Sequence, residues 1–133
     1  MAGRNNLNEL TDLAQLDADD ITIIGEKLGK ELANRFSGIK TNQVRNVYSA
    51  IISLRTKLKK PDANMEDIKR DLMLIKPKLA YAAGKQRRVK PLYDLLSQAI
   101  DLAKNSERQK ESVENFITLV ESIVAYHKFH GGE

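Results

Sequence analysis

The chain has 133 residues, no cysteine, 22 basic and 18 acidic side chains, and a formal net charge of +4. This length most simply forms one domain, and the absence of cysteine excludes disulfides and thiolate metal sites and favours a reducing compartment. The chain has no apolar run of signal-peptide length at its start and no stretch near the roughly 20 apolar residues that span a bilayer, so we expect a cytoplasmic protein without a membrane partner.

The first 20 residues are polar and end in Asp-Ala-Asp-Asp. This composition predicts a flexible acidic arm over residues 1–20, with at most one helical turn in residues 7–16. Residues 21–130 show helical periodicity almost throughout and no alternating strand pattern. We therefore expect an all-α fold, in which residues 21–130 form a compact bundle of about five amphipathic helices.

The first three helices are bounded by capping residues and by prolines. The first is predicted over about 20–36, with Asp20 as its N-cap. The second is predicted over 41–60, because a proline follows it. The third is predicted over 64–84 and should kink or restart at Pro77, since proline removes one helical hydrogen bond.

The last two helices are predicted after residue 88. The fourth starts near Val89, with Pro91 tolerated in its first turn. The fifth opens with Ser106 and Gln109, which have the spacing of a capping box. The final His-Gly-Gly-Glu should fray.

Sequence motifs of enzymes are lacking, because there is no glycine-rich phosphate loop, nucleophile elbow or cysteine nucleophile. His127 and His130 are three residues apart and have the spacing of a metal-binding pair, but we interpret them as two solvated histidines in a fraying tail. The aspartates of residues 17–20 lack the spacing and glycine of a calcium loop. We therefore predict a protein that is not an enzyme and has no cofactor or metal site.

Two segments without a single acidic residue hold more than half of the basic side chains. Residues 40–60 and 76–90 together hold 12 basic residues in 36 positions, whereas the other 97 positions hold 10 basic and 18 acidic residues. This uneven distribution suggests a surface that faces a polyanion.

The outer face of the predicted second helix carries short polar side chains instead of long charged ones: Asn42, Asn46, Ser49, Ser53 and Thr56. Such side chains permit close approach and can donate to sugar hydroxyls or phosphates. They also suit packing against another helix or a neighbouring subunit, and the sequence leaves both interpretations open.

The second basic segment combines a flexible glycine, Gly84, with five basic side chains around it: Lys76, Lys78, Lys85, Arg87 and Arg88. This combination suits phosphate oxygens, although a solvated basic loop has the same composition. Tyr81 is the one aromatic residue in this segment; it could stack or hydrogen-bond, but we expect it to be partly in the core. The chain has four tyrosines, three phenylalanines and no tryptophan, which favours contact with a nucleic-acid backbone over stacking of splayed bases.

IKTNQVRNVYSAI (39–51) and LMLIKPKLAYAAGK (72–85) resemble a pair of motifs in the small subunit of type III-A CRISPR–Cas effector complexes, the Csm complexes of antiviral defence. The likeness extends over residues 21–129. It implies a non-catalytic helical bundle that stacks with copies of itself in a filament, beside the backbone and large subunits. It also implies contact with the sugar-phosphate backbone of the duplex between guide RNA and target RNA.

Carried over to this chain, the two motifs predict an RNA-binding site at Lys40, Gln43, Arg45, Lys76, Lys78, Tyr81 and Lys85. Arg87 and Arg88 are added because of their charge. The family often has arginine at the position of Lys85, and lysine keeps the charge but loses the bidentate fork. The alternative is a structural assembly protein that makes only protein–protein contacts.

Overall fold

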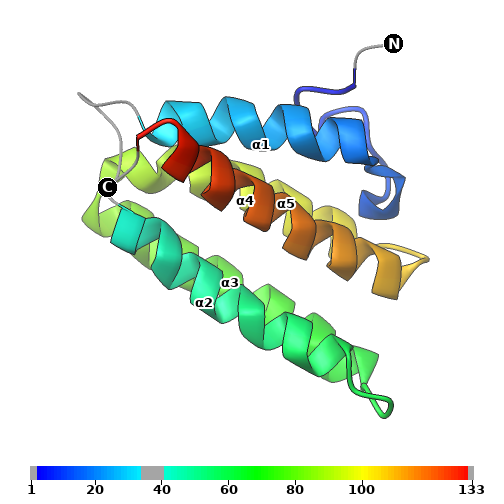
Figure 1. Ribbon diagram of the computed structural model, residues 1–133. Coiled ribbons are helices and arrows are strands. Elements are labelled where there is room, and N and C mark those ends of the chain that lie inside the picture. The colour runs from blue at the N-terminus through cyan, green and yellow to red at the C-terminus, as the bar shows by residue number, and fades with distance from the viewer. Residues whose placement is uncertain (1–2, 34–40, 132–133) are drawn as a thin grey trace.

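The computed structural model of the protein describes residues 3–33 and 41–131, and for residues 41–46 it describes the backbone only. Its α-helices, labelled in Figure 1, are α1 (Ala18–Leu32), α2 (Thr41–Leu58), α3 (Met65–Lys85), α4 (Lys90–Lys104) and α5 (Gln109–Phe129). Two short 3-10 turns are η1 (Leu13–Gln15) and η2 (Arg87–Val89). No strand occurs in the described residues, and the prediction of an all-α bundle of about five helices is confirmed.

Helices α2 to α5 form a four-helix ring in which each helix packs against the next and α5 packs back against α2. Helix α1 lies outside this ring, along α5 and against α4 (Figure 1). The helices of the ring are joined by short connections, which makes sequential neighbours antiparallel. The α2–α3 hairpin therefore forms the side of the molecule away from α1, and it carries most of both basic segments (Figure 1).

The core is built from the apolar stripes that the helical spacing predicts. Buried side chains recur every three or four residues, so that each helix turns one face to the centre. The most completely buried large side chains in the ring are Ile51 and Leu54 of α2, Ile68, Leu72 and Leu79 of α3, Leu92, Leu96 and Ile100 of α4, and Phe116 of α5.

Helix α3 continues through its proline. It runs from Met65 to Lys85 with Pro77 inside it, and Ile75 and Leu79 on either side of the proline are both buried. The predicted restart at Pro77 is therefore wrong, because the packing of this apolar stripe on the core holds both halves in one helix. Asn64 caps the helix by accepting hydrogen bonds from the amides of Glu66 (2.9 Å) and Asp67 (3.3 Å).

Two glycines let α1 lie close to α5. An added Cβ at Gly25 would collide with the Ser122 side chain, and one at Gly29 would lie 2.7 Å from the backbone nitrogen of His127. The Ser122 hydroxyl donates to the carbonyl oxygen of Ile21 at 3.1 Å, which adds a direct hydrogen bond between the two helices. The predicted end of the first helix, at residues 34–38, lies outside the described residues.

The N-terminal segment is packed against the helices, which differs from the flexible arm that we expected over residues 1–20. Leu7, Leu10, Leu13 and Leu16 are each 6% exposed or less, and η1 packs on α5 and α4. The side-chain amide of Asn115 donates to the carbonyl oxygens of Leu13 and Leu16, both at 3.0 Å. Burial of four leucines at a three-residue spacing offsets the entropy lost when the segment is ordered.

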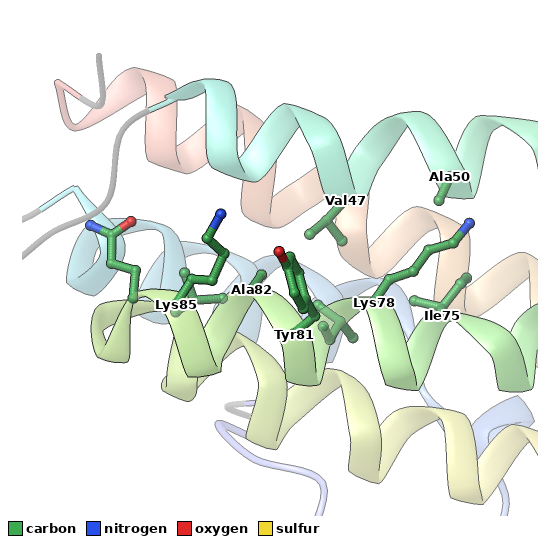
Figure 2. A pocket seen from close by; sticks show the side chains of 10 residues that line it. Val47, Ala50, Ile75, Lys78, Tyr81, Ala82 and Lys85 are labelled. Carbon is green, nitrogen blue, oxygen red and sulfur yellow. The ribbon is translucent and has the colours of Figure 1, made fainter.

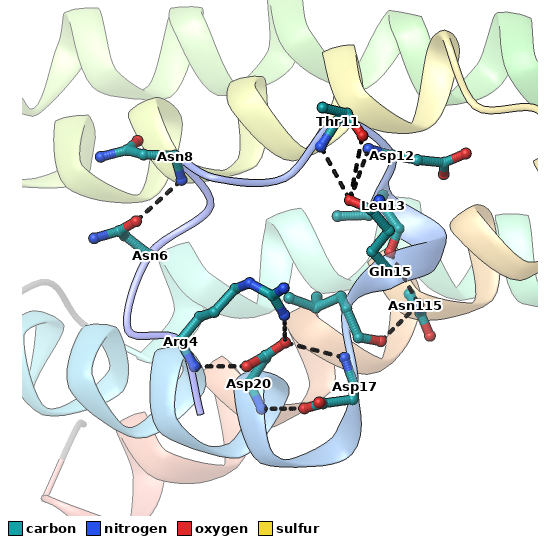
Figure 3. A network of polar contacts seen from close by, with 11 residues as sticks. Arg4, Asn6, Asn8, Thr11, Asp12, Leu13, Gln15, Asp17, Asp20 and Asn115 are labelled. Carbon is teal, nitrogen blue, oxygen red and sulfur yellow. Dashed lines mark hydrogen bonds and ion pairs between the residues drawn. The ribbon is translucent and has the colours of Figure 1, made fainter. Parts of the chain in front are cut away.

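Asp20 ties the start of the chain to α1 (Figure 3). Asp17, and not the predicted Asp20, is the N-cap of α1, and the two aspartates form a capping box. Asp20 is 1% exposed and accepts from the Arg4 amide at 2.6 Å and from Arg4 Nη1 at 2.8 Å. Burial alone would raise the pKa of Asp20, but the hydrogen bonds from the Arg4 and Asp17 amides and the Arg4 guanidinium lower it below its usual value.

Asp12 joins the N-terminal segment to the loop between α4 and α5. Its Oδ1 accepts from the hydroxyls of Ser106 (2.6 Å) and Ser112 (3.0 Å) and from the Ala14 amide (2.9 Å), and its Oδ2 accepts from the Glu107 amide (3.2 Å). Desolvation alone would raise the pKa of Asp12, but these hydrogen bonds outweigh it and lower the pKa to about 2. Ser106 thus contacts Asp12, and α5 begins without the predicted side-chain cap.

Candidate nucleic-acid interface

The α2–α3 hairpin brings the two motif-bearing segments side by side. The two helices run antiparallel, so the N-terminal half of α2 lies along the C-terminal half of α3, as Figure 2 shows. Lys40 lies outside the described residues, and Gln43 and Arg45 belong to the part of α2 whose side chains are not described. The candidate site is therefore built from the second segment and from the described part of α2.

A groove with a volume of about 660 Å³ opens between α2 and α3 (Figure 2). Its lining is mostly apolar and includes Val47, Ala50, Ile75, Leu79, Ala82 and Val89. Two of these side chains are the methyl groups of alanine, one on each helix, and they leave space where larger residues would close the gap. Lys78, Tyr81 and Lys85 of α3 also line the groove.

Tyr81 is 68% exposed, so the expectation that it belongs partly to the core is wrong. Its ring rises from α3 into the groove, with Lys85 on one side and Lys78 on the other (Figure 2). The Lys85 ammonium lies 5.4 Å from the ring centroid, which is within the range of a cation–π contact. Position 81 is on the outer side of α3 because the buried positions 75 and 79 turn the opposite side inward.

Lys78 and Lys85 keep an uncompensated positive charge at this groove. Both side chains are exposed, and within residues 3–33 and 47–131 neither forms an ion pair. Together with Tyr81 and the exposed Leu74 they follow a spacing of four, three and four residues, and hence form one stripe along α3. This spacing is visible in the sequence, and it is the signal that could have grouped these residues.

Other basic residues of the two segments are neutralised by carboxylates from elsewhere in the chain. Among the side chains that the structure describes, four such ion pairs are present: Arg55 with Glu121, Lys57 with Asp71, Lys76 with Asp101, and Lys90 with Asp94. Lys76, a predicted site residue, therefore turns toward α4, with its Nζ 2.7 Å from Asp101 Oδ1, and lies away from the groove. A segment that contains no acidic residue can therefore still have acidic side chains of other segments next to it in the folded chain.

Arg87 and Arg88 lie in η2 and do not line the groove, although Val89 of the same turn does. Both are exposed, and they line a separate hollow of about 300 Å³ with Glu31, Leu32 and Pro91. The structure thus brings together Lys78, Tyr81 and Lys85 among the predicted residues. It places Arg87 and Arg88 next to that group, toward the end of α1.

The outer face of α2 carries short polar side chains in the part of the helix that follows residue 46. Ser49, Ser53 and Thr56 are exposed there, next to Ile52, which is 41% exposed, whereas the side chains of Asn42 and Asn46 lie outside the described residues. The Thr56 hydroxyl donates to the carbonyl oxygen of Ile52 at 3.2 Å, so its donor is already used within the helix.

The two histidines are not a solvated pair in a fraying tail. His127 is 1% exposed within α5, and His130 is half-buried with its Nε2 3.5 Å from Glu26 Oε2. Among the described residues, no three histidine or acidic side chains are grouped so that they could hold a metal ion. No helix of the described residues has the length and apolarity required for a membrane span.

Comparison with known proteins agrees with the two motifs. The family model described as Csm2 Type III-A matches residues 15–133, which include both basic segments. The chain is also similar to the CRISPR system Cms protein Csm2 of Streptococcus thermophilus, with 29% identity over 96 residues, or 71% of this chain and 75% of that protein. No solved structure matches the chain.

Proposed function

This chain belongs to the Csm2 Type III-A family and is a small subunit of a type III-A CRISPR complex, and we propose that its α2–α3 side binds the sugar-phosphate backbone of the guide RNA–target RNA duplex. The observation that carries this proposal is the pair of uncompensated lysines, Lys78 and Lys85, at the groove between the two motif-bearing helices. Lysine ammonium groups contact phosphate oxygens without reading bases, so this binding tolerates any sequence.

We further propose that the subunit is non-catalytic and stacks with copies of itself beside the backbone and large subunits. Large apolar side chains are exposed on several helices, including Ile52 on α2, Leu74 on α3 and Phe129 on α5. A chain that repeats along a filament needs such contact surfaces on more than one side. Each copy then has to supply only a few phosphate contacts, because contacts from linked copies add to the avidity.

The RNA proposal is tested by the salt dependence of binding. The double variant Lys78→Gln/Lys85→Gln removes two charges, and each lost phosphate contact should reduce the slope of log K against log salt by roughly 0.7 to 0.9. We therefore expect a slope that is shallower by about 1.4 to 1.8. The measurement is fluorescence anisotropy of a labelled RNA duplex with the full chain, and with the assembled complex, at several salt concentrations.

The matched control is Lys57→Gln/Lys76→Gln, which removes the same charge from two lysines that are paired with Asp71 and Asp101. We expect its slope to stay close to that of the unchanged chain. If both double variants reduced the slope equally, only the net charge would matter, and this result would contradict a binding site at the groove. Circular dichroism checks that each variant is folded.

The alternative, an assembly protein without RNA contact, predicts a different crosslinking pattern. In the reconstituted complex, we expect RNA crosslinks within residues 78–88. Crosslinks from these residues to protein alone would favour the alternative. Crosslinks between copies of the chain would support stacking, and their absence would contradict it.

A further inference from the structure

We propose that the groove between α2 and α3 binds an unstacked base of the RNA, which stacks on Tyr81 while Lys78 and Lys85 hold the phosphates beside it. This inference rests on the proposed RNA binding and adds a second kind of contact to it. A backbone-binding surface needs only cations on its outside. The groove has more than that, namely an apolar lining and an exposed aromatic ring.

The size and lining of the groove suit a small planar group. Its volume of about 660 Å³ is within the range of pockets that take small molecules, roughly 300–1,000 Å³. Such pockets are mostly apolar with a few polar groups at defined positions. The groove has the same character, because its lining is mostly apolar and its polar groups include Lys78, Tyr81 and Lys85. Water in an apolar groove is displaced favourably by an apolar ligand face.

Tyr81 provides a stacking surface that the fold does not use. The ring is 68% exposed, although burial of an aromatic ring normally stabilises the folded protein. The Lys85 ammonium lies over the ring at 5.4 Å from its centroid, and Lys78 lies on the other side (Figure 2). A base that enters the groove from the Lys78 side would therefore meet an aromatic ring that is already held in position.

The charges favour a nucleotide over an uncharged planar ligand. Lys78 and Lys85 are seven residues apart, or about 10.5 Å along the helix, with Tyr81 between them. One cation can thus reach the phosphate on each side of a base that stacks on Tyr81. Because every base has a π face, such a pocket requires a base but not a particular one, which is compatible with guide-directed recognition of any target.

The chain has no tryptophan, so Tyr81→Trp introduces a single tryptophan into the groove, and its fluorescence can be excited apart from that of the tyrosines. We expect an oligouridine to quench this fluorescence, because a base stacks on the ring. An abasic oligomer with the same number of phosphates should bind without quenching. Ala125→Trp is the control, since Ala125 is exposed on α5 and does not line the groove, and its fluorescence should be unchanged by either oligomer.

The affinities give an independent test. Tyr81→Leu should weaken oligouridine binding roughly 5- to 100-fold, whereas Tyr81→Phe, which keeps the ring, should not. Neither change should alter the affinity for the abasic oligomer. Because Tyr81 is exposed, both variants should fold, and circular dichroism checks this.

Three results would overturn the inference, and they separate it from the proposed function. If both oligomers bind equally, with the expected salt dependence and no effect of Tyr81→Leu, the base pocket is refuted while backbone binding stands. If neither oligomer binds the full chain or the assembled complex, the base pocket is refuted, and the duplex titration with Lys78→Gln/Lys85→Gln decides the proposed function separately. If a poly-glutamate peptide quenches the Tyr81→Trp variant as strongly as oligouridine does, the groove accepts an acidic protein segment instead of a base.

Discussion

Asp12→Asn should destabilise the protein at neutral pH, and the difference in stability from the unchanged chain should disappear in acid. The variant keeps the size of the side chain but removes the negative charge of the carboxylate. This carboxylate accepts four hydrogen bonds, from Ala14, Ser106, Glu107 and Ser112. The pKa of Asp12 falls from 3.8 to about 2 in the folded chain. At about 1.4 kcal/mol per unit this corresponds to roughly 2 kcal/mol, and solvent screening of a partly exposed group reduces it toward 1 kcal/mol.

The pH dependence follows from the direction of this shift. Because the folded-state pKa of Asp12 lies below the unfolded value, the unfolded chain takes up the proton first as the pH falls. The stabilisation from Asp12 is therefore complete at neutral pH, declines below about pH 4 and is lost near pH 2. The free energy of unfolding is measured for the unchanged chain and for Asp12→Asn by urea titrations followed by circular dichroism at pH 7, 5, 3.5 and 2.5. The difference between the two free energies should shrink as the pH falls over this range.

A suitable control is Asp62→Asn, which changes an exposed carboxylate in the α2–α3 turn. It should leave the free energy of unfolding nearly unchanged at every pH. A difference between the unchanged chain and Asp12→Asn that stays constant from pH 7 to pH 2.5 would refute the reasoning, because it would come from altered packing and not from the charge.

The other predictions concern stability and are measured by urea denaturation. Gly29→Ala should lower the free energy of unfolding by about 1–3 kcal/mol, because the added Cβ would lie 2.7 Å from the backbone of α5. Gly84→Ala should raise it by about 0.5–1 kcal/mol, because the added Cβ meets nothing within 4 Å and alanine favours a helix. The opposite order would contradict the close approach of α1 and α5. Leu13→Ala should cost about 2–5 kcal/mol because Leu13 is fully buried, and a neutral result would mean that the N-terminal segment is detached in solution. Glu121→Gln removes the partner of Arg55 and should cost less than about 1 kcal/mol, with a smaller effect at high salt; a loss that salt does not change would point to packing.

Much of the helical core could be predicted from the sequence. The apolar stripes of α2 to α5 follow from local spacing, and capping by Asn64 follows from residue type at a helix start. Three residues that line the groove, Lys78, Tyr81 and Lys85, were predicted as site residues from the second motif, because the family likeness depends only on residue order. These features are local, so they need no knowledge of which helices meet.

Only the tertiary structure decided which basic side chains of the two segments remain without an ion-pair partner. Arg55 is neutralised by Glu121, which is 66 positions away, and Lys76 by Asp101, which is 25 positions away. No local pattern shows such pairs, because they arise when α2 packs on α5 and α3 packs on α4. The exposure of Tyr81 and the burial of Leu7 and Leu13 have the same origin, since the faces that remain in water are set by the neighbours each helix acquires.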